Sequence, residues 1–459
     1  MNPAVFREYD IRGVVDKDLT DNFVYELGKT IGTHALSCGA KVMSVGRDCR
    51  LSSKQYASLV ADGIASTGIN VIDIGLCATP MLYFSVYHLC IDGGVMVTGS
   101  HNPPEFNGFK ICIGKETIYG DEIQLLRNIM EARKYKTGNG KTTTQSVADA
   151  YMAHLCSSVQ IREGIKVVVD AGNGVGGMFA VPLLKAFGCK VKEIYCEPDG
   201  NFPNHFPDPT VEENIQDLIK EVKKENASLG IAFDGDADRI GVVTDEGNII
   251  WGDLLLLLFA RFIVKDNPGA TIIGEVKCSQ KLYDDIAKNG GNGIMWKAGH
   301  SLIKGKMKET KALLAGEMSG HMFFADRYFG YDDAIYASLR LLEIISLSQK
   351  KLSDLLSDVP KSFVTPEIRI DCPDEIKFKV VAEAKKRLSA KYPIIDIDGV
   401  RAILDNGWGL LRASNTQPVL VLRFEAVSSE ALQNIRNEFE SIVKAILNDY
   451  GTLLNGKDR

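Results

Sequence analysis

Short apolar runs rich in β-branched residues alternate with helical patterns over the first 360 positions of the chain. The helical pattern is clear at 53–66, where apolar residues recur on one face of the segment. Because strands that alternate with helices form layered sheets, this pattern predicts α/β layers with largely parallel strands. The predicted strands lie at 42–45, 71–74, 94–97, 166–170, 191–195, 229–233, 271–276, 294–297 and 312–315.

The pattern changes after Pro360, where strands are predicted in quick succession and a helix follows at 428–447. These strands lie at 368–370, 394–397, 400–404, 410–413 and 419–424. Strands followed by a helix indicate an α+β module, and the polar, aperiodic stretch 134–145 suits a connector. We therefore predict three related α/β domains with mixed sheets and a C-terminal α+β domain, at 1–147, 148–248, 249–360 and 361–459.

Composition and targeting signals narrow the class of protein. The most apolar run, 254–264, is interrupted by Arg261 and is too short to span a bilayer, so it predicts a buried helix and no membrane association. The start lacks the basic and apolar regions of a secretory signal. Ten cysteines without a Cys-x-x-Cys pair indicate reduced core residues and a cytoplasmic protein. With 53 Lys and Arg against 59 Asp and Glu, the net charge of −6 argues against a nucleic-acid partner.

Three aspartates, Asp234, Asp236 and Asp238, stand at every second position after the predicted strand 229–233. In an extended segment this spacing puts all three carboxylates on one side. Converging carboxylates repel one another and favour a hard cation, Mg²⁺ or Ca²⁺. An EF-hand is excluded because its loop needs Gly and Glu where this chain has Arg239 and Asp245. A solvated acidic turn is the structural alternative.

Ser100 lies in TGSHNPPEFNGFK, directly after the predicted strand 94–97. An exposed hydroxyl on a loop stiffened by two prolines suits a nucleophile. A simple turn is the alternative, because Asn-Pro-Pro and Asn-Gly are turn sequences. Further polar loops follow predicted strands: KAGHS with His300, GEMSGH with His321, and RASNTQP, whose guanidinium, hydroxyls and amide suit a phosphate clamp.

One motif points to a different function. AGNGVGG at 171–177 has the glycine spacing of a dinucleotide-binding turn and follows the predicted strand 166–170. Asp170 would lie close to the bound pyrophosphate and repel it. A tight strand-to-helix turn is therefore the preferred interpretation.

Eight motifs, in sequence order, resemble the α-D-phosphohexomutase superfamily and most of all its phosphomannomutase/phosphoglucomutase branch. They are FREYDIRG, TGSHNPPEFNGFK, VVVDAGNGVGG, DGDADR, GEVKCS, WKAGHSLIK, GEMSGH and RASNTQP, and they span the whole chain. The resemblance implies four domains around a central cleft. It also implies reversible phosphoryl transfer between the 1- and 6-positions of mannose or glucose phosphates, through a phosphoserine and a hexose 1,6-bisphosphate. One Mg²⁺ per site, glucose 1,6-bisphosphate as activator and a monomer, with a weak dimer as the alternative, are expected.

The resemblance also assigns roles to residues of this chain. It implies that Ser100 is the phosphoserine and that Asp234, Asp236 and Asp238 hold the metal with a phosphate oxygen on Ser100. The residues implied to contact the substrate are Arg12, Lys110 and Arg239 at the moving phosphoryl group, Glu317, Met318 and Ser319 at the sugar, Arg412, Ser414, Asn415 and Thr416 at the other phosphate, and Tyr9, Lys277 and His300 elsewhere. Candidates for proton transfer are His321, Lys110 and Arg12, with a neutral His321 preferred because its pKa needs the least change.

Two alternatives stay open. Phosphoglucosamine mutases resemble GEQSGH at the sugar loop, where this chain has Met318. A non-catalytic phosphosugar-binding protein would keep the cleft without turnover, although the intact Ser100 and aspartates argue against it. The basic residues of the motifs predict positive charge concentrated in the cleft, with the surplus acid elsewhere.

Overall fold

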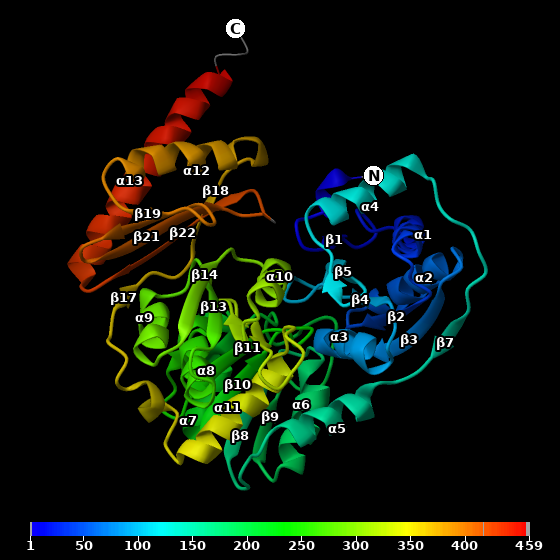
Figure 1. Cartoon of the computed structure of the whole chain (residues 1–459), viewed down its shortest axis with the longest axis horizontal. Coiled ribbons are helices and arrows are strands. Elements are labelled where there is room, and N and C mark those ends of the chain that lie inside the picture. Colours follow the sequence, from blue (N-terminus) through cyan, green and yellow to red (C-terminus); the bar gives the residue numbers. More distant parts are fainter. Residues whose placement is uncertain (1, 416, 456–459) are drawn as a thin grey trace.

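The computed structural model describes residues 2–415 and 417–455, which form four sheets covered by helices (Figure 1). The first two sheets combine parallel and antiparallel pairs, as does the third, whereas every strand pair of the fourth is antiparallel. The expected four-domain α/β architecture is confirmed. The cuts at 147, 248 and 360 stay predictions.

Domain I is a seven-stranded sheet in the order β1-β5-β4-β2-β3-β7, with β6 on β5. Its central strands β2, β3 and β4 are parallel, and β5 runs antiparallel to β4 and β1. The edge strand β7 lies in the stretch expected to be a plain connector and pairs with β3. The elements are η1 (Pro3–Val5), β1 (Ile11–Val14), α1 (Asp21–Ser37), β2 (Val42–Arg47), α2 (Ser53–Ala65), β3 (Asn70–Leu76), α3 (Thr79–His88), β4 (Gly93–Val97), β5 (Phe106–Ile113), β6 (Glu116–Thr117), α4 (Asp121–Ala132) and β7 (Thr142–Thr144).

Domains II and III repeat the strand–helix arrangement with smaller sheets, in the orders β12-β11-β10-β8-β9 and β14-β13-β15-β16. Domain II contains α5 (Ala148–Ser158), β8 (Lys166–Asp170), α6 (Gly176–Ala186), β9 (Lys190–Ile194), η2 (Glu212–Ile215), α7 (Gln216–Glu225), β10 (Leu229–Phe233), β11 (Ile240–Thr244) and β12 (Ile249–Ile250). Domain III contains α8 (Gly252–Asp266), β13 (Thr271–Glu275), α9 (Gln280–Lys288), β14 (Asn292–Trp296), α10 (His300–Thr310), β15 (Leu314–Gly316), β16 (Met322–Phe324), α11 (Ala334–Ser348) and η3 (Ser353–Leu356).

Domain IV is the antiparallel sheet β17-β22-β21-β20-β19, with β18 on β22, and two helices. One of these, α12, was missed by the strand-only interpretation of this region, although Val380, Ala384 and Leu388 recur at helical spacing and are buried. Its elements are β17 (Phe363–Val364), β18 (Ile368–Asp371), α12 (Asp374–Ser389), β19 (Ile394–Ile395), β20 (Val400–Leu404), β21 (Gly407–Ala413), β22 (Val419–Ala426) and α13 (Ser429–Asn455).

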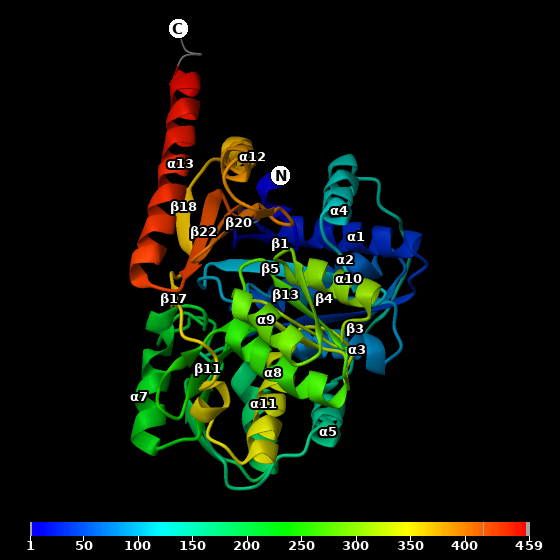
Figure 2. The same ribbon diagram turned by 60° about the vertical axis from the view of Figure 1, so that its left-hand side comes forward.

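The hydrophobic core separates domain IV from the rest. One continuous cluster runs from α3 of domain I through domain II to α8 and α11 of domain III. Domain IV has its own cluster, and its apolar contact with domain III is a small group around Val276, Trp408 and Leu410. Figure 2 shows α13 extending away from the other three domains. Domains I to III therefore pack as one unit, on which domain IV is docked.

The burial of residues tests two further expectations, one for the apolar run at 254–264 and one for the cysteines. The run at 254–264 lies within α8 and is mostly buried, as predicted, and no helix among the described residues is long and apolar enough to cross a membrane. All ten cysteines are free thiols, but Cys38 and Cys90 are exposed, so the expectation that the cysteines are core residues holds only in part.

Candidate active site

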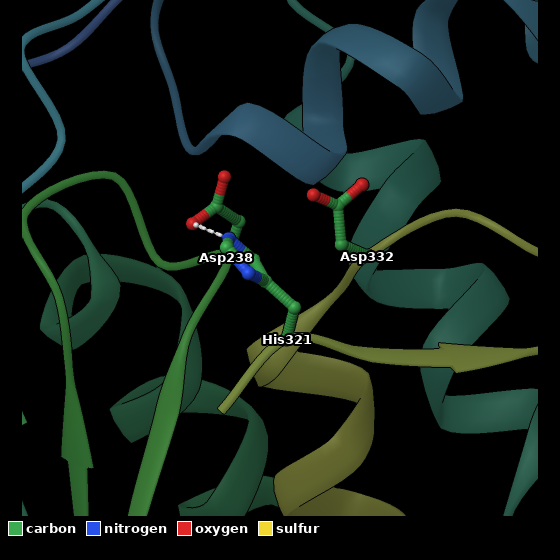
Figure 3. A group of neighbouring side chains, drawn as sticks. All are labelled: Asp238, His321 and Asp332. Atoms are coloured by element: carbon green, nitrogen blue, oxygen red, sulfur yellow. Dashed lines mark hydrogen bonds and ion pairs between the residues drawn. The ribbon is translucent and has the colours of Figure 1, made fainter. Parts of the chain in front are cut away.

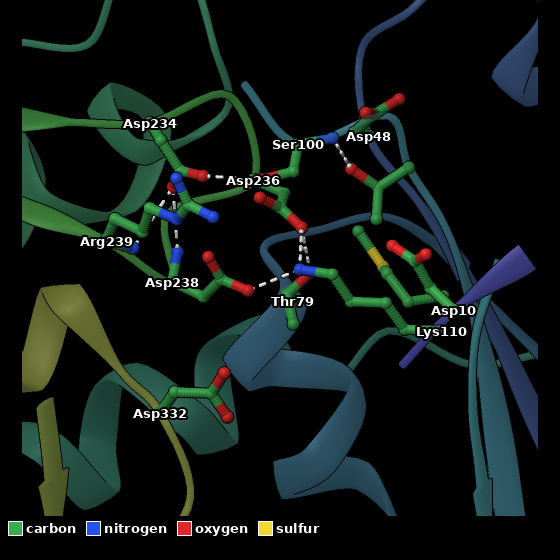
Figure 4. Close-up of polar contacts among 12 residues, drawn as sticks. Asp10, Asp48, Thr79, Ser100, Lys110, Asp234, Asp236, Asp238, Arg239 and Asp332 are labelled. Carbon is green, nitrogen blue, oxygen red and sulfur yellow. Dashed lines mark hydrogen bonds and ion pairs between the residues drawn. The ribbon is translucent and has the colours of Figure 1, made fainter. Parts of the chain in front are cut away.

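Ser100 lies three positions beyond the end of β4 and has a φ of 49°, in the left-handed region. Its side chain is not exposed as predicted: the residue is only 3% accessible. The hydroxyl donates a hydrogen bond to Asp234 Oδ2 at 2.8 Å and lies 3.1 Å from His101 Nδ1. The serine loop of domain I thus contacts the acidic loop of domain II directly (Figure 4).

Asp234, Asp236 and Asp238 are fully buried and bring one carboxylate oxygen each to within 4.8 Å of one another. The three carboxylates converge as expected, but an extended segment is not the reason. The loop after β10 is a turn with Ala237 at a φ of 58°, and Asp234 Oδ1 accepts the backbone N–H groups of Asp238 and Arg239 at 3.1 Å. Burial and the two neighbouring carboxylates raise the pKa of Asp234 well above its ordinary value.

Lys110 on β5 neutralises part of this acidic group. Its Nζ donates to Asp236 Oδ2 at 2.7 Å and also to Asp238 Oδ2. Burial alone would lower the pKa of Lys110, but the aspartates raise it, so the ammonium stays charged. Burial alone would raise the pKa of Asp238, yet Lys110 and His321 hold it well below its ordinary value.

The aspartate group fits a divalent cation. Asp236 Oδ1 is buried and accepts no hydrogen bond from the residues that the structure describes. A buried carboxylate oxygen without a partner is costly, and a cation would satisfy it. The donor set is all oxygen, which Mg²⁺ and Ca²⁺ prefer.

The glycine-rich turn at 171–177 supports this loop. The Val175 N–H donates to Gly235 O at 3.1 Å, and a Cβ on Gly174 would lie 2.7 Å from the Gly235 backbone. Gly174 is therefore required for the close approach of two loops. The turn has the structural role that was expected for it.

His321 lies between the carboxylates of Asp238 and Glu317, and Figure 3 shows its contact with Asp238. Its Nε2 is 3.2 Å from Asp238 Oδ1, and its Nδ1 is 2.9 Å from Glu317 Oε2 and 3.0 Å from Ser319 Oγ. Burial opposes the charge, but Asp238 and Glu317 raise the pKa of His321 to about 9. This differs from the neutral His321 that was expected, because Asp238 and Glu317 favour the protonated imidazole.

His300, at the start of α10, is a neutral imidazole of the site, and His101 beside Ser100 is another, since burial first holds the pKa of each well below its ordinary value. The second cause for the lowered pKa of His300 is the nearby Lys304. The Nδ1 of His300 lies 3.6 Å from Asp332 Oδ2, and Lys304 Nζ binds Asp332 Oδ1 at 3.1 Å. Its ring lies 5.6 Å from that of His321, centroid to centroid.

The loop at 317–320, which was expected to contact the sugar, follows β15. It is held by hydrogen bonds between backbone N–H groups and carboxylates. Glu317 Oε1 accepts the Gly299 N–H at 2.7 Å, and the Met318 N–H donates to Glu275 Oε1 at 2.9 Å. The side chain of Met318 packs partly against the hydrophobic core. Arg239 and His321 form an antiparallel bridge, beside which the Ile240 N–H donates to Gly320 O at 3.1 Å, and this bridge joins domains II and III.

Residues from the first and last domains meet across the site. The Tyr9 hydroxyl donates to Ala298 O at 2.9 Å and accepts from Asn415 Nδ2 at 2.9 Å. Arg12 donates to Asn102 Oδ1 at 2.8 Å, beside the serine. Ser414 Oγ accepts the N–H of Gln417 at 3.1 Å. Thr416 lies outside the described residues.

The prediction of a predominantly positive site is wrong. The basic residues do gather, but acidic residues accompany them: Arg12 pairs with Asp10 at 2.6 Å, and Arg412 with Asp398 at 3.0 Å. Lys277 lies 3.3 Å from Glu275 and 3.1 Å from Glu367. Buried cations without a bound anion need such partners, which the motif pattern did not reveal.

Several site residues were missed in the sequence. Asp48 and Arg50 follow β2 and hold the serine loop, and Thr79 at the start of α3 donates its hydroxyl to Asp236 Oδ2 at 2.5 Å. Asp332, before α11, is fully buried beside the histidines. Asp48 and Asp332 stand beside other polar residues next to a buried element, as do residues that were found, whereas Thr79 stands between Ala78 and Pro80 and has no such signal.

Comparisons with known proteins agree with this geometry. Family models described as phosphoglucomutase/phosphomannomutase alpha/beta/alpha domains I, II and III match residues 3–137, 149–247 and 251–363, and the model of the C-terminal domain matches 367–442. The chain is 48% identical over 444 residues to the phosphomannomutase/phosphoglucomutase of Pseudomonas aeruginosa, covering 96% of each chain. It is 46% identical to the phosphoglucomutase of Neisseria gonorrhoeae over 96% of this chain and 97% of that one.

A solved structure supports the same relation. The phosphoglucomutase/phosphomannomutase family protein of Burkholderia thailandensis superimposes with a TM-score of 0.91 at 41% identity, over 97% of this chain and 98% of that chain. At this identity and coverage the likeness extends to the whole arrangement of the four domains.

Proposed function

Since the chain belongs to the phosphoglucomutase/phosphomannomutase family, we propose that it reversibly moves a phosphoryl group between the 1- and 6-positions of mannose and glucose phosphates. It is an isomerase of the mutase type. The observation that carries the proposal is the contact of the Ser100 hydroxyl with the aspartate group at 2.8 Å, because it puts a nucleophile beside a site for a cation.

Ser100 is the residue that carries the phosphoryl group in this proposal. In the first half-reaction the bond from phosphorus to Ser100 Oγ breaks while a bond to the free hydroxyl oxygen of a hexose 1-phosphate forms, and the hydroxyl proton ends on Ser100 Oγ. The product is a hexose 1,6-bisphosphate. After the sugar turns over, the other phosphoryl group returns to Ser100 by the reverse steps.

Charge neutralisation comes from this chain's own cations and from Mg²⁺. Asp234, Asp236 and Asp238 would hold the Mg²⁺, which when bound stabilises the negative charge on the phosphoryl oxygens. Lys110, which is buried, and Arg239, which is partly buried, lie at the same group, and the low exposure makes their charges effective.

Proton transfer divides between two histidines. His321, with a pKa raised to about 9, is suited to give a proton, and His300, with a lowered pKa, is suited to accept one. Lys110 stays charged between its aspartates and is a poor base in this arrangement. The Arg12 guanidinium is better suited to bind the phosphoryl group.

The test is the phosphate on Ser100. Intact-mass measurement of the purified protein after incubation with glucose 1,6-bisphosphate should detect one added phosphate, which Ser100→Ala should lack. Ser85→Ala is the matched control, because Ser85 is also fully buried but lies on α3 away from the aspartates. If neither protein carries phosphate under any condition, the chain is a phosphosugar-binding protein without turnover.

A second assay addresses the sugar. Glucose 1-phosphate, mannose 1-phosphate and glucosamine 1-phosphate are compared as substrates, with glucose 1,6-bisphosphate as activator. We propose a preference for glucose or mannose, on the basis of Met318 in the sugar loop. A clear preference for the amino sugar would make the chain a phosphoglucosamine mutase. We also propose that it acts as a monomer in the cytoplasm.

A further inference from the structure

Arg50 is a buried arginine, 2% exposed, whose guanidinium binds the loop that carries Ser100. It donates to four backbone carbonyls of that loop: Ser100 O at 2.8 Å, Pro103 O at 2.6 Å, Phe106 O at 2.9 Å and Asn102 O. The two terminal nitrogens of one planar group thus bind four points of a loop of seven residues, 100–106. Only arginine has a fork of fixed donors that can do this.

Asp48 binds both the Arg50 guanidinium and the backbone before Ser100. Its Oδ2 lies 3.3 Å from Arg50 Nε and accepts the Gly99 N–H at 3.3 Å. A Cβ on Gly99 would lie 2.5 Å from Cζ and Nε of Arg50, so the loop approaches the guanidinium as closely as a glycine allows. The amide before Ser100 and the carbonyls after it are therefore held by one ion pair (Figure 4 shows Asp48 near Ser100).

Domain II covers the same guanidinium. The ring of Phe202 lies 5.0 Å from Arg50 Cζ, centroid to carbon, and the neighbouring Gly200 packs on the backbone of Cys49 and Arg50. This contact excludes water and adds a cation–π interaction. It also ties the serine loop to the domain that supplies the aspartates.

The backbone at Ser100 needs this support. A serine at a φ of 49° is in a sparsely populated region and keeps that conformation only when its surroundings hold it there. Arg50 binds the carbonyl of Ser100 itself and that of Asn102. These are the groups that would move if the loop relaxed.

We propose that Arg50, with Asp48, is the positioning residue for Ser100: it holds the serine loop in the strained conformation that directs Oγ at Asp234. This rests on the proposed role of Ser100 as the phosphoryl carrier. Arg50 acts through the backbone, and its guanidinium is not assigned to the substrate.

Arg50→Lys tests the proposal, because lysine keeps the charge but loses the fork. We expect kcat to fall about 10- to 100-fold, since a displacement of about 1 Å can cost about 10²-fold in rate. KM for glucose 1-phosphate should stay within about twofold, because the hydrogen bonds and the ring contact of Arg50 among the described residues lie in domains I and II. Arg340→Lys is the matched control: Arg340 is also buried, lies 4.8 Å over the Phe324 ring and pairs with Asp326 at 2.8 Å.

Two results would overturn the proposal: a kcat for Arg50→Lys within twofold of the unsubstituted protein, or an equal loss of kcat in Arg340→Lys. If Arg50→Lys does not fold, Gly99→Ala gives the same information, because its methyl group displaces the guanidinium. Gly99→Ala should lower kcat by a similar factor, and where Arg50→Lys does fold, Gly99→Ala should lower kcat little further in that background. A kcat unchanged in Gly99→Ala, or two losses that multiply, also contradicts the proposal.

The same proteins distinguish a failure of the proposed function from a failure of the positioning role of Arg50. If the unsubstituted protein carries no phosphate on Ser100, the proposed function fails, whatever the variants do. If it is phosphorylated and both variants keep their kcat, only the positioning role of Arg50 fails.

Discussion

Tyr9 joins three domains through a single hydroxyl, so its removal should loosen domain IV. The hydroxyl donates to Ala298 O of domain III and accepts from Asn415 Nδ2 of domain IV, both at 2.9 Å. Tyr9→Phe removes both bonds while the ring can stay against His300. Only the Asn415 bond reaches domain IV, and at about 0.5–1.5 kcal/mol it corresponds to about 2- to 13-fold in the docking equilibrium.

The effect should be visible because domain IV has its own core and only a small apolar contact with domain III. We expect faster backbone hydrogen exchange in the loop at 412–415 and a higher KM for glucose 1-phosphate, with the exchange of domains I to III unchanged. Tyr392→Phe is the control, because it loses a 2.7 Å bond to Glu438 within domain IV. If Tyr9→Phe leaves both the exchange and KM within twofold of the Tyr392→Phe values, the reasoning is refuted.

Two further predictions concern the support of the aspartate loop. His205 lies 3.2 Å from the buried Asp170, and although burial opposes its charge, this carboxylate raises the pKa of His205 above its ordinary value. The imidazolium therefore stabilises the fold most below about pH 6.5, and this stabilisation is lost as the pH rises through the raised pKa of His205. The difference in Tm between the unsubstituted protein and His205→Gln should shrink over that range. A constant difference would contradict this prediction. Thr79→Val removes the hydroxyl bond to Asp236 and should weaken Mn²⁺ binding about 10-fold by equilibrium dialysis, whereas Thr365→Val in domain IV should leave the binding constant unchanged.

The strands and the loops that follow them were predictable because their signals are local. The run at 229–233 is wholly buried, and the polar loop after it is the one with the three aspartates. Where strands pair in parallel, as β8 and β10 do, their carboxyl ends meet at one edge, so motifs that follow strands come together. This relation holds for the aspartates and the AGNGVGG turn.

The remainder depends on contacts that a sequence does not display. Whether Ser100 is exposed depends on Asp234, which is 134 positions away. The protonation of His321 depends on Asp238, in another domain, and on Glu317. The short β7 exists because β3 offers it an edge, although its own residues have no apolar pattern. By contrast, α12 and β5 were missed despite a clear local signal.

At the proposed phosphate end of the site the basic residues are paired with acids, and this bears on how a protein with a net charge of −6 would bind a dianion. Lys277 lowers the pKa of Glu367 to about 2, so that carboxylate is ionised at neutral pH, and Asp398 pairs with Arg412. These partners keep the buried cations satisfied without a ligand, which avoids the cost of an unpaired buried charge. A bound phosphate must then share the cations with these carboxylates or displace the carboxylates. The free energy of anion binding is therefore the difference between two sets of ion pairs. That difference favours a planar or tetrahedral oxyanion that binds several donors at once over a simple monovalent ion.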